Sequence, residues 1–167
     1  MATKTQPKTE KEQVEKIQGT APVKVAYYEG IGRRKVSTAR ARLYVVAEGT
    51  ATVSGYTVTK GDIVINGKTI EKYFPGEVMR KMYMEPFRTT NTIGRFAVIV
   101  KTSGGGAMGQ LGSAILAISR ALVKVDEEKF RPILKKRGFM TRDPRAKQRR
   151  KAGYAGKARA RKQSPKR

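Results

Sequence analysis

Hydrophobic and polar positions alternate with a period of two along the first apolar part of the chain. Apolar periodicity begins at Val23, the stretch 24–32 has the pattern of a strand, and a second strand covers 37–46. In this second strand the apolar series alternates with a charged or aromatic one: Ala39, Ala41, Leu43 and Val45 against Arg40, Arg42 and Tyr44. Because successive side chains of a strand point to opposite faces, the pattern predicts a sheet with one core face and one charged face.

The same alternation continues through residues 50–70. Gly55, Gly61 and the pair Asn66-Gly67 interrupt it and are typical of turns, so three or four antiparallel strands are expected here. The stretch 95–101 is apolar and β-branched, which predicts one buried strand.

Helical spacing dominates the later part of the chain. Two short helices are expected at 71–74 and 77–85, and a buried helix at 110–125, where the small residues 112–114 allow close approach to the sheet. Asp126 is predicted to cap a helix over 126–130, and Pro132 to open a further short helix that ends at Gly138. Strands come first and helices second, so the fold class is α+β: a mixed or antiparallel sheet packed against helices.

The composition divides the chain into three parts. Residues 1–24 are polar and poor in aromatic residues, which predicts a flexible extension, residues 25–140 form the globular domain, and residues 141–167 form an extended basic tail. The chain has 37 Lys and Arg against 13 Asp and Glu, a net charge of +24. The last 37 residues contribute 16 of the basic side chains and one acidic side chain. A polyanion, above all nucleic acid, is the partner that this imbalance favours.

The residue types that are absent narrow the function. With no cysteine and no histidine, the chain has no disulfide, no thiolate or imidazole catalyst and few of the usual zinc ligands. No apolar run is long enough to suggest a membrane span or a signal peptide, so a cytoplasmic protein without membrane partners is expected. We expect neither catalysis nor a cofactor.

A basic cluster follows the first predicted strand. No acidic residue stands between Glu29 and Glu48, so we expect no local pairing to neutralise this cluster, and Gly30 and Gly32 would let the backbone approach a ligand. The predicted phosphate-binding residues are Arg33, Arg34, Lys35, Arg40 and Arg42. A solvated charged face is the alternative.

The glycine-rich stretch 101–114 lies between a predicted strand and a predicted helix, where phosphate-binding loops occur. The P-loop pattern requires Lys and then Ser or Thr after its last glycine, whereas this chain has Gln110 and Leu111. Close packing or an RNA-phosphate contact is therefore favoured over nucleotide chemistry.

The tail has the composition of a segment that follows RNA phosphates. Twelve of the residues 141–167 are basic and only Asp143 is acidic, while glycines, alanines and Tyr154 separate the charges. A solubilising tail or a localisation signal is the alternative. The predicted RNA-binding residues are Arg142, Arg145, Lys147, Arg149, Arg150, Lys151, Lys157, Arg159, Arg161 and Lys162.

Several sequence blocks occur together in one order: YYEGIGRRKVSTARARL, INGKTIEKYFP, TTNTIGRFAVIVKTSGGGAMGQLGSA, ISRAL and LKKRGFMTRDPR, followed by a terminal KR. Over residues 25–167 they resemble the bacterial small-subunit ribosomal protein family nine. The resemblance implies no catalysis, a fold related to the second domain of ribosomal protein five with a left-handed β-α-β unit, and a place in the small-subunit head. There the protein would bind the 3′ major domain of 16S rRNA beside neighbouring head proteins.

The resemblance also assigns roles by position. Residues 32–35 match the family's G-R-R-K block, and residues 141–143 match its T-R-D block, where the domain gives way to the tail. The terminal Lys166 and Arg167 would reach the anticodon stem-loop of peptidyl-site tRNA. Residues 1–24 and the long hairpin around 47–60 are additions to the family pattern.

Two other hypotheses remain open from the sequence. A general packager of duplex DNA would account for the charge alone. A small phosphotransferase would account for the glycine-rich loop before a helix, although the loop lacks a suitable lysine.

Overall fold

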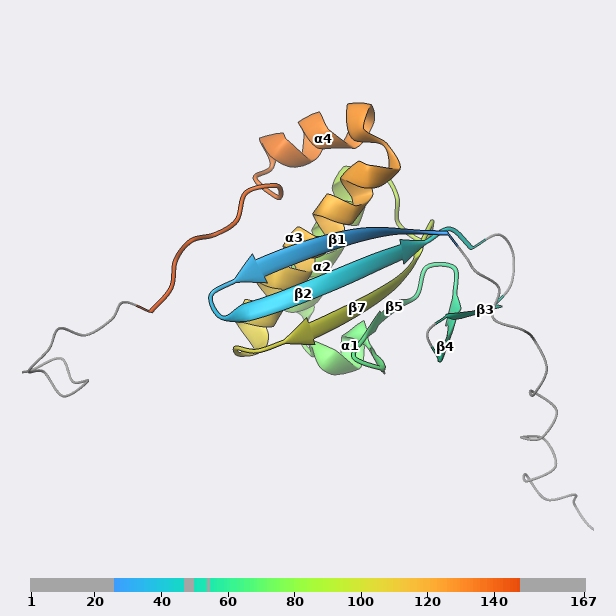
Figure 1. Ribbon diagram of the computed structural model, residues 1–167, viewed down its shortest axis with the longest axis horizontal. Coiled ribbons are helices and arrows are strands. Elements are labelled where there is room, and N and C mark those ends of the chain that lie inside the picture. The colour runs from blue at the N-terminus through green and yellow to red at the C-terminus, as the bar shows by residue number, and fades with distance from the viewer. Residues whose placement is uncertain (1–25, 47–49, 54, 148–167) are drawn as a thin grey trace, which may run out of the picture.

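A five-stranded sheet with helices behind it organises the domain (Figure 1). The computed structural model describes residues 26–46, 50–53 and 55–147. The strands are β1 (Tyr27–Arg34), β2 (Ser37–Tyr44), β3 (Thr50–Val53), β4 (Tyr56–Thr59), β5 (Ile63–Ile65), β6 (Lys68–Thr69) and β7 (Ala97–Ser103). The helices are α1 (Ile70–Tyr73), α2 (Glu77–Thr89), α3 (Ala107–Val125) and α4 (Glu127–Lys136).

The sheet is mixed, in the order β1-β2-β7-β5-β6. Its first three strands are antiparallel neighbours, whereas β5 runs parallel to β7 and is joined to it through β6, α1 and α2. The expected α+β class is confirmed. Two antiparallel hairpins, β3-β4 and β5-β6, form in the region expected to hold three or four strands, but β3 and β4 make a separate two-stranded sheet.

Helix α3 packs so closely on the sheet that β1 must carry glycine. A Cβ at Gly30 would lie 2.1 Å from the Ala117 carbonyl oxygen, and a Cβ at Gly32 would lie 2.0 Å from the Ser113 carbonyl oxygen. We expected these glycines to let a ligand approach the backbone. That interpretation was wrong, because the α3 backbone already fills the space above them.

Helix α3 begins at Ala107, three residues before the expected start, and therefore also includes Gly109. Its length and mean hydropathy would allow it to cross a membrane, but most of it is buried within the domain. Its fully buried residues, such as Leu111, Ile118 and Leu122, lie in the main hydrophobic core. We therefore regard α3 as the central core helix.

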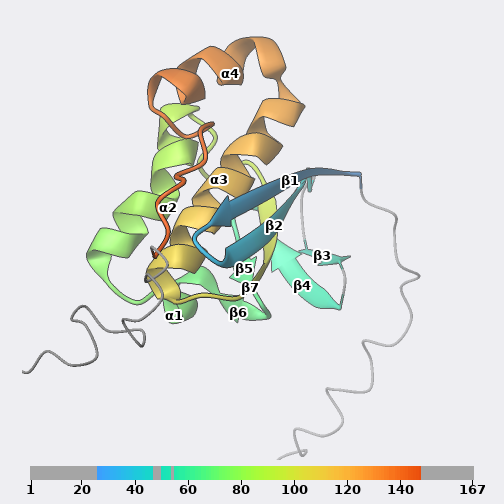
Figure 2. The same cartoon turned by 60° about the vertical axis from the view of Figure 1, so that its left-hand side comes forward.

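Among the described residues, only the β3-β4 hairpin lies over the other face of the sheet, and it covers one end. Figure 2 shows the β3-β4 hairpin on the side of the sheet opposite to α2 and α3. Beneath it Tyr44 and Val46 join a second hydrophobic cluster with Val58 and Ile99, while Val45 is 53% exposed. The alternation predicted for this strand thus holds at Ala39, Ala41 and Leu43. It is wrong at Tyr44, which the hairpin helps to bury in a second core, and at Val45, which lies beyond the end of β2 and is exposed.

Two prolines lie inside helices whose bounds differ from those predicted from the sequence. Helix α2 runs to Thr89, beyond the expected end at residue 85, and buries Pro86 and Phe87. Helix α4 is continuous through Pro132, so the prediction of a new helix at that residue was wrong. The predicted cap is confirmed, since the Lys129 amide donates to Asp126 Oδ1 at 3.1 Å. In both helices burial of neighbouring apolar side chains offsets the hydrogen bond that proline cannot donate.

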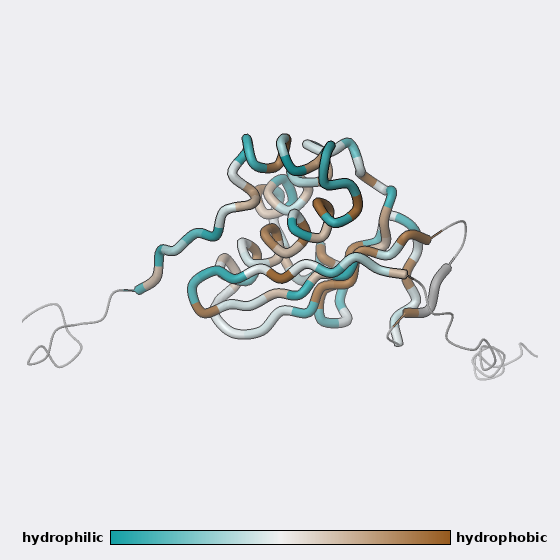
Figure 3. The backbone as a smooth tube through the Cα atoms, turned by 45° about the horizontal axis from the view of Figure 1, so that its top comes forward, coloured by the Kyte–Doolittle hydropathy of each residue, from teal (hydrophilic) through white to brown (hydrophobic). Residues whose placement is uncertain are grey.

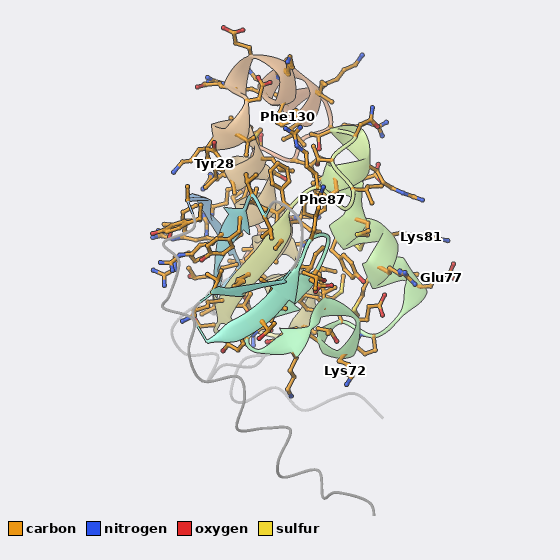
Figure 4. All side chains as sticks on the ribbon, turned by 90° about the vertical axis from the view of Figure 1, so that its right-hand side faces the viewer. Tyr28, Lys72, Glu77, Lys81, Phe87 and Phe130 are labelled. Atoms are coloured by element: carbon orange, nitrogen blue, oxygen red, sulfur yellow. The ribbon has the colours of Figure 1, made fainter. Side chains whose placement is uncertain are left out.

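Helix α4 covers one end of the helical layer. Phe130 and Leu134 are its buried residues, and Figure 4 shows Phe130 and Phe87 directed into the domain, whereas Lys72, Glu77 and Lys81 point outward. Figure 3 shows that α4 and the segment after it are largely hydrophilic, in contrast to the brown, hydrophobic parts of α3 and the sheet. The apolar surface of α4 therefore faces inward and its charges face solvent.

Candidate nucleic-acid interface

The turn between β1 and β2 presents three consecutive cations at one end of the sheet. Arg34 pairs with Ser37 at the end of the ladder, Lys35 adopts a left-handed conformation with φ 52°, and Val36 is 80% exposed. Arg33 and Lys35 are exposed, so their charges are available to a partner. The predicted cluster of Arg33, Arg34 and Lys35 is therefore present at this turn.

The glycine-rich loop is packed against this turn. A Cβ at Gly104 would lie 2.8 Å from the Val36 carbonyl oxygen, and one at Gly105 would lie 2.1 Å from Ser37 Oγ. Both glycines have positive φ, and the Ser37 hydroxyl donates to the Gly104 carbonyl at 2.9 Å. Of the two interpretations favoured from the sequence, close packing accounts for these two glycines.

Arg34 extends from the turn across the start of α3. Its aliphatic part occupies the space of a missing side chain at Gly112, where a Cβ would lie 2.3 Å from Arg34 Cδ. Its guanidinium group donates to the Met108 carbonyl at 3.5 Å and pairs with Asp143 Oδ2 at 3.2 Å. Arg34 thus joins the hairpin, the core helix and the segment that follows α4.

Asp143 is the acceptor for two arginines. Besides Arg34, it receives the Arg145 amide at 3.1 Å and the Arg145 guanidinium Nη2 at 2.8 Å. Hydrogen bonds from Arg145, with the charge of Arg34 as a smaller contribution, hold the pKa of Asp143 well below its usual range. The carboxylate therefore stays ionised and fixes the first residues of the basic segment beside the hairpin.

A hollow of about 210 Å³ lies between these elements. It is lined by Arg33 and Arg34 from the hairpin, by α3, and by Phe139, Thr141 and Asp143 from the segment after α4. Arg142, Arg145 and Lys147 are exposed. The hairpin and the start of the basic segment therefore form one continuous basic surface.

Arg42 is less available for phosphate binding than the sequence suggested. The strand register sets it opposite Glu29, and its Nε donates to Glu29 Oε2 at 2.9 Å. This hydrogen bond raises the pKa of Arg42, and its guanidinium group also lies 4.7 Å from the Tyr27 ring centre. The expectation that no local acid would pair with the cluster was wrong, because the acid lies across the strand pair and not between the arginines.

Arg40, one pleat away, lies opposite a cation instead. Its partner in the register with β7 is Lys101, a residue not selected from the sequence. The signal was present, since Lys101 is the first charged position after the buried run of β7. The position of Lys101 opposite Arg40 depends on the order of the strands in the sheet, which could not be predicted from the sequence.

Nine predicted sites lie outside the described residues. They are Arg149, Arg150, Lys151, Lys157, Arg159, Arg161, Lys162, Lys166 and Arg167. The expectation for residues 1–24 also lies outside them, as do residues 47–49 and 54 of the hairpin expected around 47–60. Within the described ranges, no group of three or more metal-binding side chains was found.

An α+β domain with its cations gathered at one end of a sheet has the charge distribution typical of proteins that bind nucleic acid. A family model described as ribosomal protein S9/S16 matches residues 32–167. The small ribosomal subunit protein uS9 of Cutibacterium acnes (strain DSM 16379 / KPA171202) is 42% identical over 132 residues, which are 79% of this chain and 69% of that protein. The chain therefore belongs to the ribosomal protein S9/S16 family. This family is structural and non-enzymatic, so the phosphotransferase hypothesis is wrong.

Proposed function

We propose that the protein is a structural constituent of the small ribosomal subunit that binds 16S rRNA of the head, within its 3′ major domain. Membership of the family supports the ribosomal part of this proposal. The observation that carries the RNA-binding part is the Arg34–Asp143 pair, which joins the basic turn to the start of the basic segment. One RNA surface could then contact both at once.

The basic side chains of this surface would bind RNA phosphates and thereby set the position of the protein on the RNA. Arg33, Lys35, Arg142 and Arg145 present exposed guanidinium or ammonium groups, and such groups release condensed counterions when they bind a phosphate backbone. Arg40 extends this surface onto the sheet. Arg42, held by Glu29, would contribute mainly by positioning Tyr27 and the edge of β1.

The remaining assignments extend the proposal along the chain. Residues 149–162 would follow the same rRNA, and Lys166 and Arg167 would reach the anticodon stem-loop of peptidyl-site tRNA. The domain would occupy residues 25–140, beside neighbouring head proteins in cytoplasmic ribosomes. Its β5-α2-β7 crossover would have the left hand of the second domain of ribosomal protein five, and the parallel pairing of β5 with β7 is consistent with such a unit.

Hydroxyl-radical footprinting of small subunits assembled with and without the protein tests this function. We expect protection confined to the head, with the last protected positions near the peptidyl site. Diffuse protection, or tighter binding to random duplex DNA than to a 16S head fragment at physiological salt, would instead favour a general packager. A variant that lacks Lys166 and Arg167 should assemble normally and release peptidyl-site tRNA faster.

A further inference from the structure

Part of the sheet face is not reached by the β3-β4 hairpin, and within the described residues it carries two rows of mainly polar side chains. Buried Ala39 and Ala41 face α3, so the alternate residues of β2, Thr38 and Arg40, face the other way. The register places Arg33, Thr38 and Ser103 in one row across β1, β2 and β7. It places Ile31, Arg40 and Lys101 in the next row.

The second row contains a like-charge pair. Arg40 and Lys101 are directly opposite each other on antiparallel strands, both are exposed, and together with Arg42 and Ile99 they line one shallow depression. Within the described part of the chain neither forms an ion pair. Opposed like charges destabilise a strand pair in the absence of a ligand. An anion between them would remove that repulsion.

The first row is suited to the neighbouring anion. It offers the Arg33 guanidinium group and the exposed hydroxyls of Thr38 and Ser103, and it lies two residues further along β2, which is about 6.8 Å in an antiparallel strand. Two cationic rows at this spacing match consecutive phosphates of one nucleic-acid strand better than a single small anion. Ile31, 46% exposed beside Arg40, adds an apolar surface for the sugar or base edge.

We propose that Arg40 and Lys101 bind one phosphate of an rRNA strand, and that Arg33, Thr38 and Ser103 bind the next, across the bare face of β1, β2 and β7. This inference rests on the proposed function and adds Lys101, Thr38 and Ser103 to the interface. The β3-β4 hairpin closes the other end of the face, so the RNA strand would lie at the end near the β1-β2 turn.

The test uses the full chain and a transcript of the 16S 3′ major domain, with binding measured over a range of salt concentrations. Lys101→Gln and Arg40→Gln should each weaken binding about 3- to 10-fold and reduce the slope of log K against log salt by about 0.7 to 0.9. Because both side chains would hold the same phosphate, the double variant should lose less than the sum of the two single losses. Lys72→Gln removes the same charge from α1, away from this face, and is the matched control.

Hydroxyl removal gives a second, independent measurement. The double change Thr38→Ala with Ser103→Ala should weaken binding and leave the salt slope unchanged, since no charge is lost. In the free protein, Lys101→Gln should not lower the melting temperature, because it removes a repulsion.

The outcomes separate this inference from the proposed function. If wild-type protein binds the transcript tightly but Lys101→Gln and Lys72→Gln have equal affinities and slopes, the bare face does not bind RNA and the inference is overturned. If wild-type protein binds the transcript no better than duplex DNA of equal charge, the proposed function itself fails. A loss of affinity in Lys101→Gln for an acidic peptide but not for the transcript would identify a protein partner and also overturn the proposal.

Discussion

The contact between β1 and α3 predicts that Gly30→Ala will destabilise the domain. The new Cβ would lie 2.1 Å from the Ala117 carbonyl oxygen and 2.6 Å from the Ala121 nitrogen, and ordinary contact begins at 3.4 Å. Both atoms belong to the α3 backbone, so no side-chain rotation relieves the clash. The helix must move away from the sheet by roughly 1 Å. A gap of this size removes about a quarter to a half of the dispersion energy of each contact between the helix and the sheet.

The cost can be estimated from what α3 buries. Overpacking a well-packed core costs about 1–3 kcal/mol when side chains adjust, and a backbone shift lies at the upper end, so we expect a loss of about 3 kcal/mol or more. For a domain of this size that corresponds to a fall in melting temperature of about 10 °C. Urea unfolding followed by circular dichroism would measure the free energy directly.

Gly106→Ala is the matched control. A Cβ at Gly106 meets nothing within 4 Å and its φ is −109°, so the same substitution should cost at most about 1 kcal/mol, from the lost preference for glycine at a helix start. If Gly30→Ala unfolds at the same urea concentration as this control, the close approach of α3 to β1 is not a constraint and the reasoning is wrong.

Three further predictions concern single side chains. The pKa of Asp143 is lowered, so its ion pair with Arg34 should persist as the pH falls through 3.8, the usual pKa of an aspartate, and should break only in stronger acid. An NMR titration of this carboxyl group with a midpoint at or above 3.8 would contradict the prediction. Glu29→Gln should release Arg42 and tighten RNA binding a few-fold with a steeper salt slope, whereas unchanged binding would show that Arg42 does not face RNA. Asn66→Ala removes an amide that bonds the β7 backbone in both directions at 3.0 Å, and should cost about 2 kcal/mol in chemical denaturation; a loss below about 0.5 kcal/mol would refute its structural role.

Local patterns were sufficient to predict most of the elements. The alternation at Ala39, Ala41 and Leu43 identified the core face of β2, and Asp126 identified the start of α4, because both signals depend on residues near in sequence. The end of β2 could not be predicted in this way. Tyr44 is buried by a hairpin whose position relative to the sheet does not follow from the period of two.

Only the part of the candidate site that depends on residues near in sequence could be predicted. The cluster at residues 33–35 lies on one turn, so its proximity follows from sequence. The partners of the neighbouring arginines depend instead on strand register: Arg42 meets Glu29, and Arg40 meets Lys101. The glycines of β1 were misinterpreted because the sequence does not show which helix crosses them. The roles of residues 148–167 stay predictions.

The Arg34–Asp143 pair has a kinetic consequence. It gives the basic segment a fixed starting point next to the turn, so under the proposed function an RNA bound at the turn would present its next phosphates to Arg145 at a high effective concentration. The second contact is then an intramolecular event that requires little further search. Loss of this single carboxylate would therefore slow the completion of binding more than it would change the final contacts.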